Sequence, residues 1–149
     1  MTLNARSDGG FEYQVEGRVL SVNQLLVDAA FTVEMTSPEV RPSASVSVRL
    51  GGAFKCWFGG DEKAFDPEHN RVGLGPALAL WGSRLRELTI SSDSSLLMVF
   101  QNGTRLAVPP DPDLEAWTLN DHEGLLVVGG PSDRVSVFRR RAEGTQRLG

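Results

Sequence analysis

The residues that could do chemistry gather in two acidic loops. The first loop brings carboxylates and an imidazole close together in the sequence: Asp61, Glu62, Asp66, Glu68 and His69. Oxygen and nitrogen ligands of this kind suit a divalent cation. Their spacing, however, matches neither the calcium-loop pattern nor the His-Glu-x-x-His helix of metalloproteases. We therefore expect a solvated acidic loop, with no metal and no cofactor.

The second acidic loop runs from Pro109 to Trp117 and carries the carboxylates of Asp111, Asp113 and Glu115 between three prolines and the tryptophan. Prolines restrict the backbone, so less entropy is lost when such a loop is held in a complex. A stiff acidic rim beside a tryptophan would suit a basic partner surface. The alternative is that the prolines only turn a corner between strands and that Trp117 fills the core.

Motifs for catalysis are missing from the sequence. The chain has two histidines, His69 and His122, and no Gly-x-Ser-x-Gly elbow that would expose a nucleophilic serine. Cys56 alternates with phenylalanines, which predicts a small buried hydrophobic residue rather than a reactive thiol. The glycine-rich segment before Pro76 opens a helix, but this proline removes an N–H that an anion would use. We therefore expect a protein that is not an enzyme.

Composition narrows the class of protein and its partners. A chain of 149 residues fits one domain, and its net charge of −4 argues against nucleic acid as a partner. A single cysteine excludes an internal disulfide and any multi-cysteine metal site. No apolar run approaches the length of a membrane span, and the first residues lack the apolar region of a secretion signal. The expected location is the cytoplasm, with no membrane as partner.

The ends of the chain are expected to differ from its body. Residues 1–149 form one domain in this interpretation, with residues 1–10 and 140–149 flexible. The C-terminal tail is basic, because Arg139, Arg140 and Arg141 are followed by Arg147. Charge runs of this kind are usually solvated, so we assign the tail no function.

Apolar and polar residues alternate in short runs, which is the period of half-buried strands. The Asn102-Gly103 pair between two such runs predicts a hairpin. One segment departs from the pattern: Pro76 to Trp81 predicts a short helix capped by Gly82, with Leu74, Leu78 and Trp81 on one stripe. The predicted strands are Phe31 to Met35, Val46 to Leu50, Phe54 to Phe58, Leu96 to Phe100, Thr104 to Val108, Glu115 to Leu119, Leu125 to Val128 and Arg134 to Phe138.

A weak internal duplication suggests how these strands are organised. Each copy has an opening glycine, a glycine hairpin and an Asp-Pro loop. The sequence therefore predicts a mainly β protein, an antiparallel β-sandwich or partly open barrel built from two related units. The first copy contains Gly17, Gly51-Gly52 and Asp66-Pro67, and the second contains Gly82, Asn102-Gly103 and Asp111-Pro112.

The order of motifs in the last two thirds of the chain resembles a family of small uncharacterised bacterial proteins. The most specific piece is the series Gly103-Thr104-Arg105-Leu106, Pro109-Pro110-Asp111-Pro112 and Glu115-Ala116-Trp117. The resemblance implies one β-rich domain, and it implies no activity. Small acidic proteins without cofactors are often antitoxin-like partners of secreted effectors, and here this is an analogy alone.

Together these observations predict a cytoplasmic protein-binding domain. Its specific form would be an immunity protein that blocks a toxin with acidic loops. The alternatives are a small-ligand-binding domain, metal-binding domain or enzyme with a carboxylate site at Asp66, Glu68 or His69, and a module that assembles with itself through exposed strand edges. The predicted partner-binding residues are Asp66, Glu68, Asp111, Asp113, Glu115 and Trp117.

Overall fold

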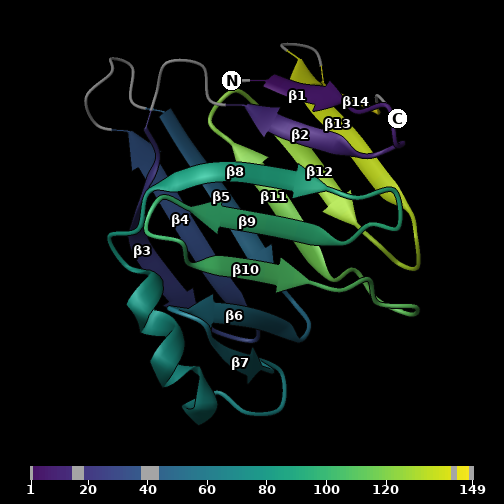
Figure 1. The fold of residues 1–149 in the computed structure, drawn as a ribbon. Helices are drawn as coiled ribbons and strands as arrows, with labels where there is room; N and C mark the ends of the chain where they lie inside the picture. The colour runs from purple at the N-terminus through teal and green to yellow at the C-terminus, as the bar shows by residue number, and fades with distance from the viewer. Residues whose placement is uncertain (1, 15–18, 38–43, 142–143, 148–149) are drawn as a thin grey trace.

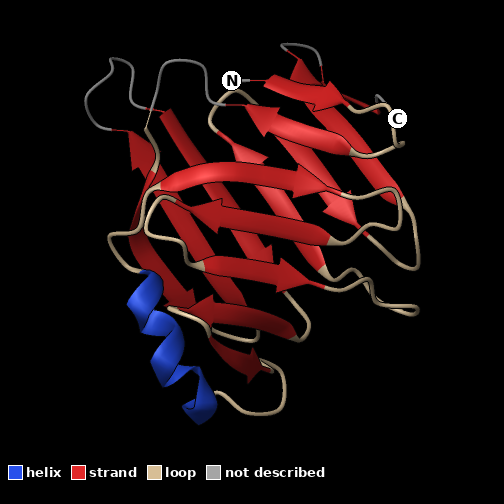
Figure 2. Ribbon diagram, in the orientation of Figure 1, coloured by secondary structure: helices blue, strands red, loops and turns tan. Residues whose placement is uncertain are grey.

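In the computed structural model, which describes residues 2–14, 19–37, 44–141 and 144–147, two antiparallel sheets pack face to face (Figures 1 and 2). Sheet A has the strand order β1-β2-β8-β9-β10-β6-β7, and sheet B has the order β14-β13-β12-β11-β5-β4-β3. The strands are β1 (Thr2–Ala5), β2 (Phe11–Gln14), β3 (Ser21–Val27), β4 (Phe31–Ser37), β5 (Ala44–Leu50), β6 (Phe54–Phe58), β7 (Asp61–Phe65), β8 (Leu85–Ile90), β9 (Leu96–Phe100), β10 (Arg105–Val108), β11 (Trp117–Asp121), β12 (Leu125–Gly129), β13 (Val135–Arg141) and β14 (Gly144–Arg147).

Alternating side chains build the core between the sheets. In β5, the side chains of Val46, Val48 and Leu50 are buried, whereas Arg49 is exposed on the outer face. The predicted mainly β class and the predicted strands are therefore confirmed, with shifted ends. Cys56 is fully buried, and burial raises the pKa of its thiol to about 12. The thiol is thus protonated at neutral pH, as expected for a core residue.

The strands that the sequence pattern did not reveal include all four sheet edges, β1, β7, β3 and β14. An edge strand has a partner on one side alone, so more of its surface faces water. In β7, for example, Phe65 is the one buried residue, and the four residues before it are exposed. Such a strand lacks the alternation on which a sequence-based assignment depends.

The strand order supports the predicted organisation into two related units. One unit places the β3-β4-β5 meander in sheet B and then the β6-β7 hairpin in sheet A. The other places the β8-β9-β10 meander in sheet A and then the β11-β12 hairpin in sheet B. The units interlock, because β5 pairs with β11 and β10 pairs with β6. Each meander is therefore completed by the hairpin of the other unit.

The predicted correspondence between the two copies is wrong at the first glycine turn. Gly51-Gly52 does not close a hairpin: it carries the chain from β5 in sheet B to β6 in sheet A. Its counterpart is the β10–β11 connection, to which it is joined by a hydrogen bond of 3.0 Å from the Gly51 N–H to the Ala116 carbonyl. Asn102-Gly103 does close a hairpin, between β9 and β10, as predicted.

The single helix of the described residues is η1 (Val72–Leu80), a 3₁₀-helix rather than an α-helix. A 3₁₀-helix has three residues per turn, so every third side chain lies on the same face. Leu74, Ala77 and Leu80 are accordingly buried. The predicted stripe is wrong for Leu78 and Trp81, which are 57% and 66% exposed, because it assumed the α-helical period.

Trp117 is a core residue, which agrees with the alternative that this side chain fills the core. Its side chain is 1% exposed, and its indole N–H donates a hydrogen bond of 2.7 Å to the carbonyl of Ser94. A Cβ at Gly129 on the neighbouring strand would overlap the indole ring. Ser94 lies in the β8–β9 turn of sheet A and Trp117 in sheet B, so this bond joins the two layers.

Both ends of the chain contain strands. Thr2–Ala5 pairs with β2, and Gly144–Arg147 pairs with β13. Residue 1 and residues 142–143 and 148–149 lie outside the described residues, so flexibility of the termini stays a prediction. Within the described residues, no helix has the length and apolar character that crossing a membrane requires.

The Trp117→Phe substitution should lower the free energy of unfolding by about 2 to 4 kcal/mol. It removes buried ring volume and leaves the Ser94 carbonyl without its donor. The matched control is Trp81→Phe on the surface, which should change stability by less than about 0.5 kcal/mol. Urea denaturation of the three proteins measures the difference. Equal midpoints for the two variants would contradict the role assigned to Trp117.

Candidate functional site

The two acidic loops leave the same end of sheet A. Phe65, the last residue of β7, pairs with Phe54, and the β6–β10 register places Val108 on the other side of Phe54. Neighbouring strands lie about 4.8 Å apart, so the two loops begin about 10 Å from each other. In Figure 1, both loops lie toward the lower right, after β7 and after β10. The topology thus brings together residues that are far apart in the sequence.

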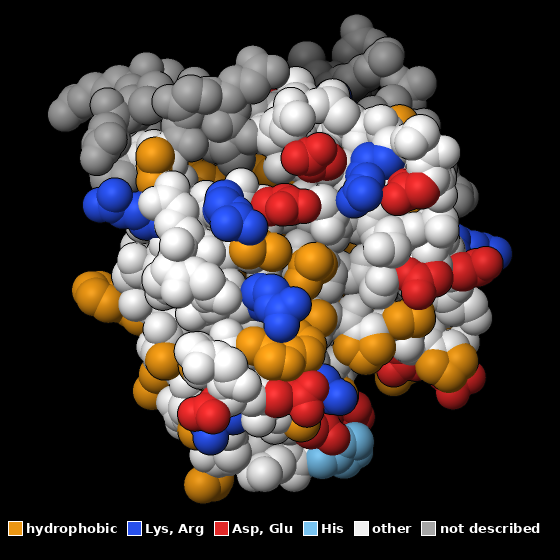
Figure 3. Space-filling model, viewed as in Figure 1, with side chains coloured by type: hydrophobic (Ala, Val, Ile, Leu, Met, Phe, Trp, Pro, Cys, Tyr) orange, Lys and Arg blue, Asp and Glu red, His pale blue; other side chains and the backbone are white. Residues whose placement is uncertain are grey.

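Other acidic turns lie at the same end of the sandwich. The β1–β2 and β8–β9 turns are aligned with it through the pairing of Phe11 with Ile90 and of Val108 with Leu96. In sheet B, the pairing of Trp117 with Leu50 and Gly129 aligns the β12–β13 connection in the same way. Figure 3 shows acidic side chains along this right-hand rim. We call this surface the acidic end, and its carboxylates are those of Asp8, Asp28, Asp66, Glu68, Asp93, Asp111, Asp113, Glu115 and Asp133.

Four of these aspartates have a local structural task. The side chains of Asp8, Asp28, Asp93 and Asp111 each accept a hydrogen bond of 2.8 to 2.9 Å from the backbone N–H two residues further on. This is the Asx turn, which accounts for aspartate at such positions without any partner. Asp8 and Asp28 also form ion pairs with arginines. Local structure therefore accounts for an aspartate at each of these four positions.

Asp66 is also held locally, by His69. Its carboxylate lies 2.9 Å from Nδ1 of His69 and accepts a hydrogen bond of 3.3 Å from the His69 backbone N–H. The side-chain hydrogen bond to His69 holds the pKa of Asp66 below its usual range, and the same bond raises the pKa of His69. The pair therefore stiffens the loop between β7 and η1.

The remaining carboxylates have no such task. Glu68, Asp113, Glu115 and Asp133 are exposed, and their side chains make no hydrogen bond or ion pair with the described part of the chain. Local structure therefore gives no reason for acidic residues at these four positions. They are the charges of the acidic end that are free to meet another molecule.

The loop that carries Asp113 and Glu115 is fixed to the core. The Asp111 carbonyl accepts a hydrogen bond of 2.7 Å from the N–H of Ser132, and the Ser132 hydroxyl donates a bond of 3.2 Å to the Pro112 carbonyl. Between the two free carboxylates, the side chain of Leu114 is 60% exposed. Sequence reasoning did not single out Leu114, whose exposed apolar side chain lies between these two carboxylates in the chain.

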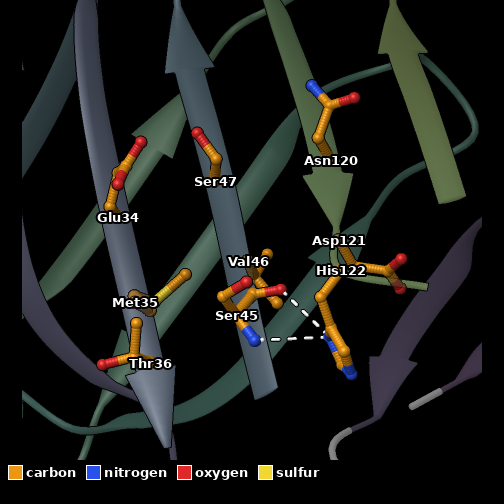
Figure 4. Close-up of a pocket in the computed structure, with 9 residues that line it drawn as sticks. All are labelled: Glu34, Met35, Thr36, Ser45, Val46, Ser47, Asn120, Asp121 and His122. Carbon is orange, nitrogen blue, oxygen red and sulfur yellow. Dashed lines mark hydrogen bonds between the residues drawn. The ribbon is translucent and has the colours of Figure 1, made fainter. Parts of the chain in front are cut away.

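A separate depression lies on the outer face of sheet B (Figure 4). It has a volume of about 200 Å³ and is lined by residues of β4, β5 and β11 with the turn after β11. The His122 ring is held at its rim, with Nδ1 3.3 Å from the backbone N and O of Ser45. Hydrogen bonding to a small polar molecule is the chemistry open to the lining residues, which are Glu34, Met35, Thr36, Ser45, Val46, Ser47, Asn120, Asp121 and His122.

Sequence reasoning missed this depression because its polar residues come from three strands. Glu34, Ser47 and Asn120 are aligned side by side by the pairing of β4, β5 and β11. The sequence does show a polar residue at each outward position of these strands. Any solvated sheet face has the same pattern, so it does not identify a depression. Within the described ranges, no cluster of three or more His, Cys, Asp or Glu residues is placed to hold a metal ion.

The chain belongs to a family of unknown function, DUF6188, whose model matches residues 13–139. This finding confirms the resemblance to an uncharacterised β-rich family. Comparison with curated proteins and with solved structures gave no match. The family carries no activity or partner to this chain, so the function must be argued from the site itself.

Asp66→Asn should lower the pKa of His69 toward its ordinary value. The neutral amide no longer favours the charged imidazole, which in the wild type is stabilised by the carboxylate. NMR titration of the His69 ring protons measures the change. Glu68→Gln is the matched control and should lower this pKa less, because Glu68 makes the smaller contribution. An unchanged His69 pKa in Asp66→Asn would contradict the pairing.

Proposed function

We propose that this chain is a cytoplasmic protein-binding domain, not an enzyme, and that its acidic end binds a basic surface of a partner protein. The observation that carries this proposal is the position of Glu68, Asp113 and Glu115. These exposed carboxylates have no task within the described structure, and they lie on two loops that leave the same end of sheet A, one strand apart. Several unpaired charges of one sign on one surface speed the encounter with a partner of opposite charge.

The fixed geometry of the loops also favours binding. Asp111 and Ser132 hold the β10–β11 loop through four of its backbone groups, and Asp66 with His69 holds the other loop. A loop that is already ordered loses little entropy in a complex, so more of the contact energy appears as affinity. The arrangement thus serves recognition by shape as well as by charge.

Leu114 supplies the apolar centre that an interface needs. Charged side chains at the rim of an interface contribute modestly, whereas apolar groups that fill a partner pocket contribute most of the affinity. Leu114 stands between Asp113 and Glu115 and is 60% exposed. We therefore expect Leu114 to enter a pocket while the two carboxylates meet cations around it.

The specific form of this function that we propose is that of an immunity protein which blocks a toxin. Enzymes that act on nucleic acids need basic clefts, because they must bind phosphate groups. An acidic surface with a protruding leucine is complementary to such a cleft. The acidic end would then inhibit by occupying the cleft, without any chemistry of its own.

The geometry favours a protein partner over a small ligand. Typical ligand pockets have volumes of about 300 to 1,000 Å³ and enclose most of their ligand. The depression beside His122 is about 200 Å³. The alternative site around Asp66, Glu68 and His69 is an exposed loop in which Asp66 already bonds to His69. A carboxylate-based ligand site there stays a prediction.

Reversing the free charges should weaken the complex and leave the fold intact. The partner is captured from a lysate of the native host on the immobilised wild-type protein, purified, and titrated by biolayer interferometry. At low salt, Asp113→Lys/Glu115→Lys should lower the affinity at least about tenfold, mainly through a slower association. The difference should shrink at high salt, because exposed charges are screened.

The matched control is Asp61→Lys, an exposed charge reversal at the opposite end of β7. It should change the affinity less than about twofold, since it lies away from the acidic end. Asp111 is left unchanged in this experiment because its side chain shapes the loop. Equal affinity of the wild type and the double variant for the partner at low salt would contradict the proposal.

A further inference from the structure

Exposed apolar side chains are concentrated along β3 and η1. Seven large hydrophobic residues are exposed in the described part of the chain, and Leu114 is the one that belongs to the acidic end. Figure 3 shows apolar side chains along the left-hand rim, over η1. The other six lie on β3 and η1 or next to them: Val19, Leu26, Val27, Val72, Leu78 and Trp81.

The first half of the outer edge of β3 is paired with another segment of the chain. β3 is the last strand of sheet B, and its first residues are paired on their outer side with the segment after η1. The N–H of Val22 donates to the Ser83 carbonyl, and the N–H of Gly82 donates to the Val22 carbonyl, both at 2.8 Å. The Trp81 indole then donates to the carbonyl of Asn23 at 3.3 Å.

The second half of β3 has no such cover. A register shift follows Val22, and from Gln24 to Val27 the strand pairs with β4 alone among the described residues. Unpaired N–H and C=O groups along a strand form a template for another strand. Natural edges are usually protected by charge or proline, yet β3 reads Ser-Val-Asn-Gln-Leu-Leu-Val and has neither.

The absence of charge indicates which molecule fits this edge. The carboxylate that follows this segment, Asp28, is already paired with Arg49 at 3.1 Å, and Glu34 lies on β4, opposite Gln24. The chain has a net charge of −4, which disfavours the approach of two copies through acidic surfaces. Two copies that meet through the neutral β3 edge bring no like charges together. The surface is thus self-complementary in backbone hydrogen bonds, in apolar side chains and in charge.

We propose that a second copy of this chain binds here, by antiparallel pairing of the two Leu25–Val27 edges. A two-fold axis perpendicular to sheet B joins the two B sheets into one continuous sheet. The cores of both copies then lie on the same side of this sheet, because inner-face residues pair with inner-face residues. With Leu26 on the axis, Leu26 of each copy lies opposite Leu26 of the other on the outer face. The exposed Trp81 and Leu78 flank the junction, and the β10–β11 loops of both copies stay free.

Cysteine crosslinking tests this contact directly. Directly opposed residues of an antiparallel pair have Cβ atoms about 4.5 to 5.5 Å apart, within reach of a short bismaleimide. Leu26→Cys should give a covalent dimer as the main product in dilute solution, because the native Cys56 is buried and does not react. Leu114→Cys is the matched control and should stay mainly monomeric. Equal crosslinking of the two variants would overturn the proposal.

Sedimentation velocity over a concentration series gives an independent readout. The wild type should pass from monomer to dimer as its concentration rises through the micromolar range. Leu26→Lys should shift the midpoint at least tenfold higher, since two like charges then meet on the axis. Leu114→Lys should behave as the wild type. A wild type that stays monomeric throughout, or a Leu26→Lys variant that dimerises equally well, overturns the proposal.

Discussion

The hydrogen bond from the Trp117 indole to the Ser94 carbonyl is the contact on which the acidic end depends. Ser94 is fully buried in the β8–β9 turn, and it has a φ of 73°, a conformation that few residues other than glycine adopt. Its hydroxyl donates a second bond, of 2.6 Å, to the carbonyl of Ser132. Ser132 in turn holds the carbonyls of Asp111 and Pro112. A continuous path of bonds therefore leads from the core to the exposed acidic loop.

This path gives the end of the sandwich its distinctive property, which is exposed charge on a fixed backbone. A loop that reaches far from the sheets would ordinarily be mobile. Here Asp111 uses its side chain and its carbonyl to fix the loop, while Asp113 and Glu115 remain exposed. Turn geometry thus accounts for one group of carboxylates, whereas the other group makes no hydrogen bond or ion pair with the described residues.

The sequence predicted the parts of the fold that depend on local pattern. Alternation predicted the inner strand that contains Val46, Val48 and Leu50. Turn chemistry predicted the hairpin at Asn102-Gly103. Edge strands such as β7 were missed because exposure removes that alternation. The helix was found, but its face was not, because nothing local distinguishes three residues per turn from 3.6.

The candidate site could be predicted in its residues but not in its arrangement. The Pro109 to Glu115 loop was identified by its composition, whereas the sequence left open whether Trp117 lies at the surface or in the core, because burial depends on the facing sheet. The closeness of this loop to Asp66 follows from β6 lying between β7 and β10, which is a non-local pairing. Leu114 carries no sequence signal, since its exposure depends on how Ser132 holds the loop.

Hydrogen–deuterium exchange of the purified complex tests the central claim most directly, because it reports where a partner touches the backbone. The acidic end predicts slower exchange in peptides covering residues 66–70 and 110–116 when the partner is bound, and unchanged exchange at Glu34, Ser47 and His122 around the depression. Slower exchange around that depression, with both acidic loops unaffected, would contradict the account.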